Sequence, residues 1–268
     1  MRKTISVMAV FLTALFMVGL LSIPAFAQLT FSGASTITDN LMPDLTKVFT
    51  EKNKIKFDSM ESVNSNVAFQ ALVDGKCLIA GVAKNLTADD KKNNCFTQIF
   101  GYDPLVAFVN EKNAVANLSK DQIKGIFTGK ITNWKDVGGA DAKITVVIDQ
   151  PTSGAHKEFK KIMLDDAEYV AAKIADKPAV CVEDASKDAN TVTYASISWK
   201  RDGVKAVSID KIAPTPEAVA DGDYILSRPL ILVTKEVPKD NIKLFFDFVM
   251  SPEGQEVVGK KFVPAKKK

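Results

Sequence analysis

A regular alternation of short apolar runs with longer helical periods, over residues 29–83, most constrains the fold of this chain. The apolar runs at Leu29–Ser32, Ile55–Ser59 and Leu78–Ala83 predict strands. Between them, the apolar positions of Ile37–Phe49 and Val67–Val73 recur at the spacing of a buried helix face. Strand–helix–strand–helix–strand order is typical of a parallel sheet with crossover helices. This part of the chain is therefore predicted to be α/β.

The remainder continues in the same manner. Extended segments are expected at Phe96–Asn110 (interrupted at Gly101 and Pro104), Ile144–Ile148 and Tyr224–Thr234, with strands or turn-rich pieces at Ala179–Val182 and Thr191–Trp199. Helices are expected from the capping box Ser119-x-x-Gln122 through Phe127, at Ala155–Leu164, at Lys239–Met250, and from Ser251 through Val258.

Two long extended segments, near 102–110 and 224–234, bracket the middle of the chain. The chain is expected to cross between two α/β lobes once in each direction, so that the lobes close around a ligand on two hinge strands. The expected boundaries are 28–109 plus 226–268 for lobe 1 and 110–225 for lobe 2. Each lobe is expected to hold a mixed, mostly parallel sheet flanked by helices.

Residues 1–27 have the features of a secretory signal peptide. Arg2 and Lys3 give a basic start, Val7–Ile23 is an apolar run, and Ala25-Phe26-Ala27 is a small-x-small cleavage site. We expect cleavage after Ala27, a periplasmic or secreted product, and no stable membrane anchor afterwards. Without these 27 residues the chain of 268 keeps 241, with 33 basic and 32 acidic side chains.

The charge balance and the few metal-binding side chains exclude several classes of function. A nearly neutral chain gives no footprint for nucleic acid. One His and three Cys cannot supply the four ligands of a structural zinc, so no metal and no cofactor are expected. Because an exported chain permits disulfides, Cys77 and Cys95 could be bridged, which would leave Cys181 unpaired. The alternative is three buried free thiols.

Three strand-to-helix junctions are rich in hydroxyl or small residues. They are Ser32-Gly33-Ala34-Ser35-Thr36, Ser62-Val63-Asn64-Ser65-Asn66 and Thr152-Ser153-Gly154. Ser and Thr are also ordinary helix caps, so each junction alone has a purely structural interpretation. Several helix N-termini directed at one cleft would instead make an anion site, because their N–H groups are unpaired and hydroxyls add donors.

The chain resembles the periplasmic phosphate-binding protein family of ABC importers, which has the type II periplasmic-binding-protein fold. The resemblance rests on Phe31–Ile37, Phe127–Trp134 (FTGKITNW), Ser153-Gly154, Gly203–Val207, Ser227–Leu230 and Phe248–Gln255, which span nearly the whole mature chain. It implies an exported monomer that captures phosphate or a related oxyanion and hands it to an ABC importer permease, without catalysis.

The resemblance also implies the ligand-binding residues. The family's hydroxyl positions fall on Ser35, Thr36 and Ser65, and its third loop on Ser153 and Gly154. That loop typically runs Arg-x-x-x-Ser-Gly-Thr, whereas this chain has Asp149 and Ala155 at the Arg and Thr positions.

The departures leave two alternatives. Either Asp149 points away and Lys84 or His156 supplies positive charge, or the ligand is not phosphate. Ala34, Lys84, Asp149, Ala155 and His156 are therefore expected near the ligand.

Two other functions compete with transport. Ser153 and His156 lie three residues apart, which could place a Ser–His pair on one helix face, although a capping Ser followed by a first-turn His explains the spacing equally. A hydrolase would lose turnover in Ser153→Ala. A diverged sensor or scaffold with a different ligand, or none, would keep the fold without the importer.

Overall fold

Residues 29–265 are described in the computed structural model, so the predicted signal peptide lies outside them. The strands are β1 (Leu29–Ala34), β2 (Phe57–Val63), β3 (Ile79–Ala83), β4 (Phe96–Asn110), β5 (Asn117–Leu118), β6 (Thr145–Ile148), β7 (Lys173–Ile174), β8 (Thr191–Ser196), β9 (Val204–Ile209), β10 (Ser227–Thr234) and β11 (Val263–Pro264). The helices are α1 (Ser35–Asn40), α2 (Met42–Asn53), α3 (Ser65–Val73), α4 (Ala88–Lys91), α5 (Lys120–Phe127), α6 (Gly154–Leu164), α7 (Pro178–Lys187), α8 (Pro216–Asp221), α9 (Asp240–Met250) and α10 (Pro252–Gly259), with 3₁₀ turns η1 (Trp134–Val137) and η2 (Ile197–Trp199).

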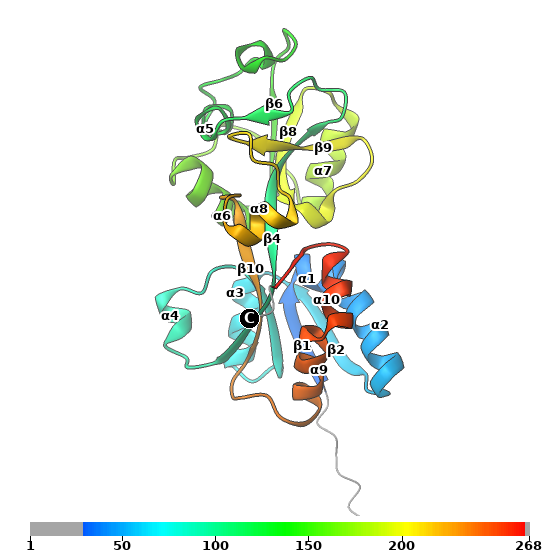
Figure 1. The fold of residues 1–268 in the computed structure, drawn as a ribbon. Coiled ribbons are helices and arrows are strands. Elements are labelled where there is room, and N and C mark those ends of the chain that lie inside the picture. The colour runs from blue at the N-terminus through cyan, green and yellow to red at the C-terminus, as the bar shows by residue number, and fades with distance from the viewer. Residues whose placement is uncertain (1–28, 266–268) are drawn as a thin grey trace, which may run out of the picture.

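The elements gather into two lobes stacked end to end (Figure 1). The first lobe holds β1–β3, α1–α4, α9 and α10, and the second holds α5–α7 and β5–β9. Each lobe has its own large hydrophobic cluster, one around Phe31, Phe49 and Phe245 and the other around Phe127 and Tyr194. The mixed α/β fold with helices flanking each sheet is the one that the sequence predicts.

The first lobe forms as the strand–helix alternation predicts. β1 pairs in parallel with both β2 and β3, which puts the carboxyl ends of these strands at one edge. The expected helix Ile37–Phe49 is two helices that meet at Leu41. Pro43 lies in the first turn of α2, where the backbone N–H that proline lacks has no partner in the helix anyway. In a continuous helix Pro43 would stand in the interior, and its missing N–H would remove one backbone hydrogen bond.

Two antiparallel strands, β4 and β10, connect the lobes. β4 is continuous over 15 residues, whereas interruptions were expected at Gly101 and Pro104. Its first part, Phe96–Pro104, pairs with β10, and Leu105–Asn110 pairs with β8 and β9. Pro104 is tolerated because it stands where β4 exchanges one set of neighbours for the other. The sheet order β2-β1-β3-β10-β4-β8-β6-β7 therefore passes from lobe to lobe through β10 and β4.

One element of the second lobe differs from the prediction. The segment Ala179–Val182, expected to be a strand or turn-rich piece, lies in helix α7. Pro178 occupies the first turn of this helix, and Cys181, Val182 and Ala185 are buried against the sheet. A four-residue apolar run cannot distinguish a strand from a short buried helix, since both bury it.

The three cysteines are free thiols, so the bridge between Cys77 and Cys95 is not formed. Cys77 is hydrogen-bonded to the backbone of Ser32, whereas the Cys95 thiol faces the carbonyl of Asn93 at 3.8 Å. Burial raises the pKa of both thiols, and that of Cys181 to about 12. Within residues 29–265, no helix is long and apolar enough to cross a membrane.

Candidate functional site

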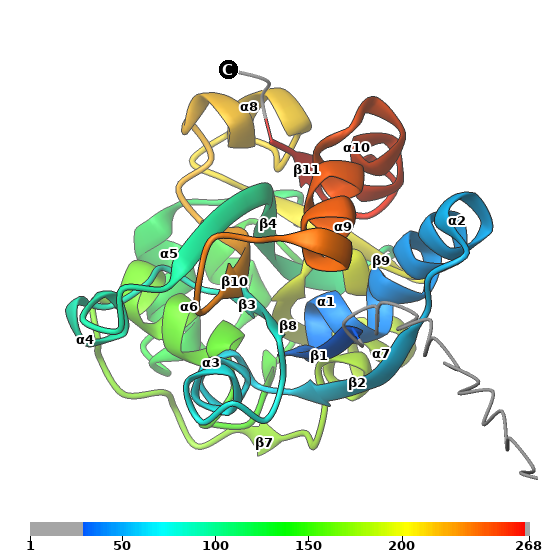
Figure 2. The same cartoon turned by 90° about the horizontal axis from the view of Figure 1, so that it is seen from below.

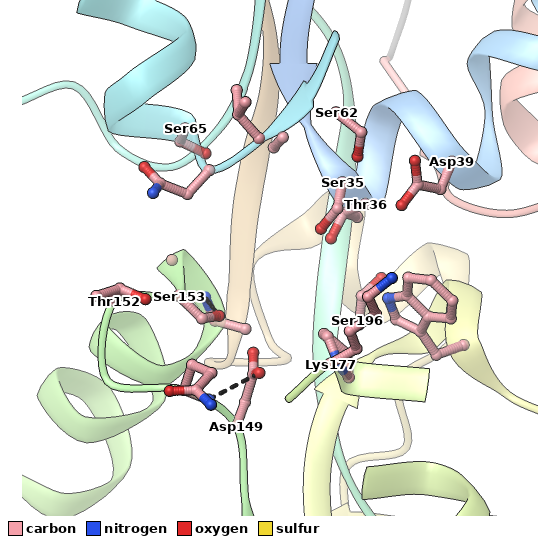
Figure 3. A pocket seen from close by; sticks show the side chains of 18 of the residues that line it. Ser35, Thr36, Asp39, Ser62, Ser65, Asp149, Thr152, Ser153, Lys177 and Ser196 are labelled. Atoms are coloured by element: carbon pink, nitrogen blue, oxygen red, sulfur yellow. Dashed lines mark hydrogen bonds between the residues drawn. The ribbon is translucent and has the colours of Figure 1, made fainter. Parts of the chain in front are cut away.

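A cavity of about 430 Å³ lies between the two lobes. Figure 3 shows Ser35, Thr36, Ser62 and Ser65 of the first lobe facing residues of the second lobe across a gap. Most residues expected at the site line this cavity: Ala34, Ser35, Thr36, Ser65, Asp149, Ser153, Gly154 and Ala155. The three hydroxyl-rich junctions therefore meet at one place, as the parallel strand order predicts.

Capping contacts hold the hydroxyls in place. Ser153 is the N-cap of α6, and its Oγ accepts hydrogen bonds from the backbone N–H groups of Ala155 (3.1 Å) and His156 (3.5 Å). Asn64 caps α3, and the Oγ of Ser65 accepts a bond from the N–H of Ala83 at 3.1 Å. Because the Ser65 oxygen acts as an acceptor within the protein, its hydroxyl proton remains available for a ligand oxygen, whereas the Ser153 hydroxyl also hydrogen-bonds the carboxylate of Asp149.

Arg228 supplies the buried positive charge of the cavity. Its side chain is 3% exposed, and Arg228 is the second residue of strand β10, where the chain crosses between the lobes. Nε and Nη2 both donate to Oδ2 of Asp103, at 3.0 and 2.9 Å, and Nη2 also donates to Oγ1 of Thr36 at 3.2 Å. Two of its three nitrogens are thus held by the protein.

The third guanidinium nitrogen lies near the middle of the site. A Cβ atom added to Gly154 would stand 3.3 Å from Nη1 of Arg228 and 3.8 Å from Oγ of Ser65. Side chains from β10 and α3 thus converge on the start of α6, and the absence of a side chain at Gly154 keeps the space between them open. This arrangement directs an N–H group and hydroxyl groups at one small volume.

Asp149 lines the same cavity as an acidic group. The carboxylate is 2% exposed; its Oδ1 accepts a bond from the N–H of Gln150 at 2.8 Å, and its Oδ2 is buried without an ordinary hydrogen-bond partner among the described residues. Burial raises the pKa of Asp149, against the opposing influence of Ser153, the Gln150 N–H and the nearby charges of His156 and Arg228. A buried carboxyl oxygen with a free lone pair is suited to share a proton with a ligand.

The first sequence alternative, in which Asp149 points away and Lys84 or His156 supplies charge, is wrong for all three residues. Lys84 is outside the cavity lining, and its Nζ is paired with Asp90 and Asn66, each at 2.7 Å. His156 is also outside the lining, since its Nδ1 contacts the carbonyl of Asp149 and the hydroxyl of Tyr194. Burial lowers the pKa of His156, which favours the neutral ring.

A Ser153–His156 catalytic pair is also not formed. The Nδ1 of His156 is engaged by the Asp149 carbonyl and by Tyr194, and the ring packs against Tyr169 at 4.4 Å between centroids. Ser153 and His156 are joined through the backbone N–H of His156, not through its ring. The spacing therefore reflects helix capping.

Several lining residues were not expected from the sequence: Arg228, Lys177, Asp39, Asp176 and Trp199. The Arg-Pro pair within the second crossing segment was the available signal for Arg228. A charged side chain in a buried strand is rarely buried unless it is paired, so an arginine there indicates an ion pair or a binding site. Lys177 precedes α7, which was predicted to be a strand or a turn-rich piece, so the sequence did not place Lys177 at a strand-to-helix junction.

These features define a two-lobed binding protein with a hydrogen-bonding, partly cationic interlobe cleft. A family model described as the PBP superfamily domain matches residues 22–253, and the chain belongs to this superfamily.

Similar proteins carry related names. The phosphate-binding protein PstS of Bacillus subtilis is 29% identical over 87% of this chain and 79% of its own length. PstS of Borreliella burgdorferi is 24% identical over 84% of this chain and 86% of its own length. A structure described as a phosphate ABC transporter substrate-binding protein with bound phosphate, from Clostridium perfringens, is 30% identical, with a TM-score of 0.82 over 90% of this chain and all of its own.

Proposed function

We propose that this chain is an exported, non-enzymatic binding protein that captures inorganic phosphate in the interlobe cleft and delivers it to an ABC permease. The observation that carries the proposal is the convergence of Arg228 Nη1, Ser65 Oγ and the N-terminus of α6 around Gly154. A guanidinium, hydroxyl donors and a helix N-terminus together are suited to an oxyanion. The relatives named for phosphate binding support the choice of oxyanion.

Asp149 favours phosphate over sulfate in this proposal. Phosphate retains a proton at neutral pH, and that proton can be shared between a ligand oxygen and the unpaired Oδ2 of Asp149. Sulfate brings no proton, so its binding requires either a protonated Asp149 or two facing negative charges, which is unfavourable in a buried site. The acidic substitution at the family's Arg position is thus compatible with phosphate, because Arg228 supplies the cation.

Closure of the lobes would couple binding to delivery. Two bodies would move about β4 and β10, with boundaries close to the predicted 28–109 plus 226–268 and 110–225, except that Leu105–Val109 would move with the second lobe, against which they pack. A ligand that contacts both bodies favours the closed arrangement. A permease could then distinguish the loaded form by its shape. Export to the periplasm or medium follows from the predicted signal peptide.

A thermal-stability panel on the mature chain tests the choice of ligand. Phosphate, sulfate, molybdate and small organic acids would each be added at millimolar concentration. We expect the largest rise in Tm with phosphate, since a ligand that binds only the folded state stabilises it. A larger rise with another anion would replace phosphate as the ligand, and no rise with any of them would reject anion binding.

A further inference from the structure

A continuous chain of hydrogen bonds leads from the cleft cation to a contact between the lobes. Oδ2 of Asp103 accepts from Arg228, and Oδ1 accepts from Oγ of Ser196. Oγ of Ser196 is 2.7 Å from Oγ of Ser198, which in turn lies 3.2 Å from Nδ2 of Asn40. Asn40 is the last residue of α1 in the first lobe, whereas Ser198 belongs to η2 in the second.

The protons along this chain can have only one arrangement. A hydroxyl has a single proton, and that of Ser196 is donated to the Asp103 carboxylate. Ser196 must therefore accept from Ser198, and Ser198, having donated its own proton, accepts from the amide of Asn40. Every donor points toward the same buried charge, so each bond polarises and strengthens the next.

The chain begins and ends on the same short helix. Arg228 also donates to Thr36 in the first turn of α1, while Asn40 stands at the end of α1. Asp103 is fully buried and Ser196 is 1% exposed, which limits competition from water at the centre of the chain. A displacement of α1 relative to η2 would break the Asn40–Ser198 bond and leave Ser198 to reorient.

We propose that Asn40, Ser198, Ser196 and Asp103 form a closure relay that couples the interlobe contact at Asn40 to the orientation of Arg228 in the ligand site. In the closed molecule the relay completes the hydrogen bonds of Asp103, which holds the guanidinium with Nη1 toward Gly154. In the open molecule the relay is interrupted at Asn40, and Arg228 is held less firmly. Asp103, Ser198 and Asn40 are positioning residues in this scheme and lie outside the cavity lining, whereas Ser196 is itself one of the lining residues.

A second interlobe hydrogen bond provides a matched control. Nδ2 of Asn85 donates to Oε1 of Glu158 at 3.2 Å, also across the cleft, yet neither residue belongs to the relay. Asn40→Ala and Asn85→Ala each remove one hydrogen bond that a side-chain amide donates from one lobe to the other. Only Asn40→Ala should change how firmly Arg228 is held.

The test is a double-mutant cycle measured without ligand and with phosphate. Spin labels at Lys47→Cys and Ala189→Cys, in a Cys95→Ser background, report the distance between the lobes. Without ligand, we expect Asn40→Ala and Ser196→Ala each to shift the open–closed ratio roughly fivefold toward open, the effect of one hydrogen bond. The double variant should open no further than either single variant, whereas Asn85→Ala combined with Ser196→Ala should be additive.

The measurements with phosphate rest on the proposed function and are interpreted separately from the ligand-free measurements. Dissociation of phosphate should be roughly fivefold faster in Asn40→Ala and Ser198→Ala, and Ser198→Thr, which keeps the hydroxyl, should restore the native rate. If the native protein binds no phosphate, the proposed function fails and the ligand-free cycle still judges the relay. Additive effects of Asn40→Ala and Ser196→Ala, or an unchanged lobe distance in Asn40→Ala, would overturn the relay.

Discussion

At the scale of single residues, the buried cation of the cleft, Arg228, is held by one buried anion, Asp103. Arg228 and Asp103 are 3% and 0% exposed, and the guanidinium makes two bonds to a single carboxylate oxygen. Burial raises the pKa of Asp103, and the Arg228 charge with the Ser196 hydrogen bond acts against it. A planar guanidinium can bind Asp103 and Thr36 and still direct Nη1 at the cleft, which an ammonium group cannot do.

Arg228→Lys is therefore expected to weaken phosphate binding although it keeps the charge. Loss of a charged hydrogen bond costs about 1.5–3 kcal/mol, which corresponds to roughly a 10- to 150-fold rise in Kd. Arg201→Lys is the matched control, because Arg201 is half-exposed and only 3.7 Å from Glu183. Calorimetric titration of both variants decides the matter, and equal Kd values would show that Arg228 is not a ligand-binding residue.

Asp149→Asn should alter both stability and selectivity. Because burial raises the folded-state pKa of Asp149 above its ordinary value of 3.8, the folded protein holds this proton at pH values where the unfolded chain has lost it. The native carboxyl thus lowers stability as pH rises from its ordinary pKa through the raised one. Asp149→Asn should remove that slope, so the variant gains stability relative to wild type at pH 7 but not at pH 3 in urea titrations.

The same substitution should reduce the preference for phosphate over sulfate by about tenfold or more, since the shared proton is lost. Asp176→Asn, a change at another acidic lining residue, should leave the preference unchanged. An unaltered ratio of phosphate to sulfate affinity in Asp149→Asn, measured at pH 7, would refute the role given to this carboxyl.

At the scale of helices and strands, the ends of elements set the geometry of the cleft. Gly154 is the first residue of α6, and a Cβ there would approach Nη1 of Arg228 to 3.3 Å. Gly33, at the end of β1, is required for packing instead, because a Cβ would stand 2.4 Å from the Phe31 ring. The two glycines therefore serve different purposes, although both belong to hydroxyl-rich junctions.

Gly154→Ala should weaken phosphate binding at least tenfold with a change in unfolding free energy below about 1 kcal/mol, because helix starts tolerate Ala. Gly259→Ala in α10 is the control, since its Cβ would approach Pro264 to the same 3.3 Å far from the cavity. Titration calorimetry and urea unfolding of both variants give the comparison. Unchanged affinity in Gly154→Ala would mean that the ligand does not approach the start of α6.

The elements of the first lobe and both crossing strands could be predicted from sequence because local patterns determine them. Alternating apolar periods place β1, β2 and β3 in parallel, and this order brings Ser35, Thr36 and Ser65 to one edge. Helix α7 was missed since its apolar run is too short for periodicity to decide.

The partners of long side chains could not be predicted, because they depend on contacts between distant elements. Lys84 is drawn to Asp90, while Arg228 is held by Asp103, 125 residues away. His156 turns from the cavity because Tyr194 offers it a hydrogen bond from β8. The spacing of residues along one helix does not indicate which side chains of other elements they will contact.

At the scale of the whole molecule, two lobes with separate cores are joined by two strands and share one cleft. Figure 2 shows the lobes overlapping in the view from below, with β2, α3, β7 and α7 along one side and α8, α10 and β11 along the opposite side. The two clusters meet at the C-terminal segment, where Phe262 belongs to the first cluster and Val263 to the second. In the proposed function, binding energy gained across the cleft would stabilise the closed form.

Phosphate at a hundred times its Kd should stabilise the protein by about 2.7 kcal/mol, which raises Tm by roughly 5–10 °C in a chain of this size. Differential scanning calorimetry measures the shift, and Arg228→Lys at the same phosphate concentration should show a much smaller one. An equal shift in that variant would place phosphate binding outside the cleft.

The proposed function requires that the interlobe cleft bind one phosphate ion. The most direct measurement is isothermal titration of the mature chain, residues 28–268, with inorganic phosphate at pH 7. We expect one ion per chain with a Kd in the micromolar range or tighter. No measurable heat and no binding at millimolar phosphate would show that the cleft is not a phosphate site.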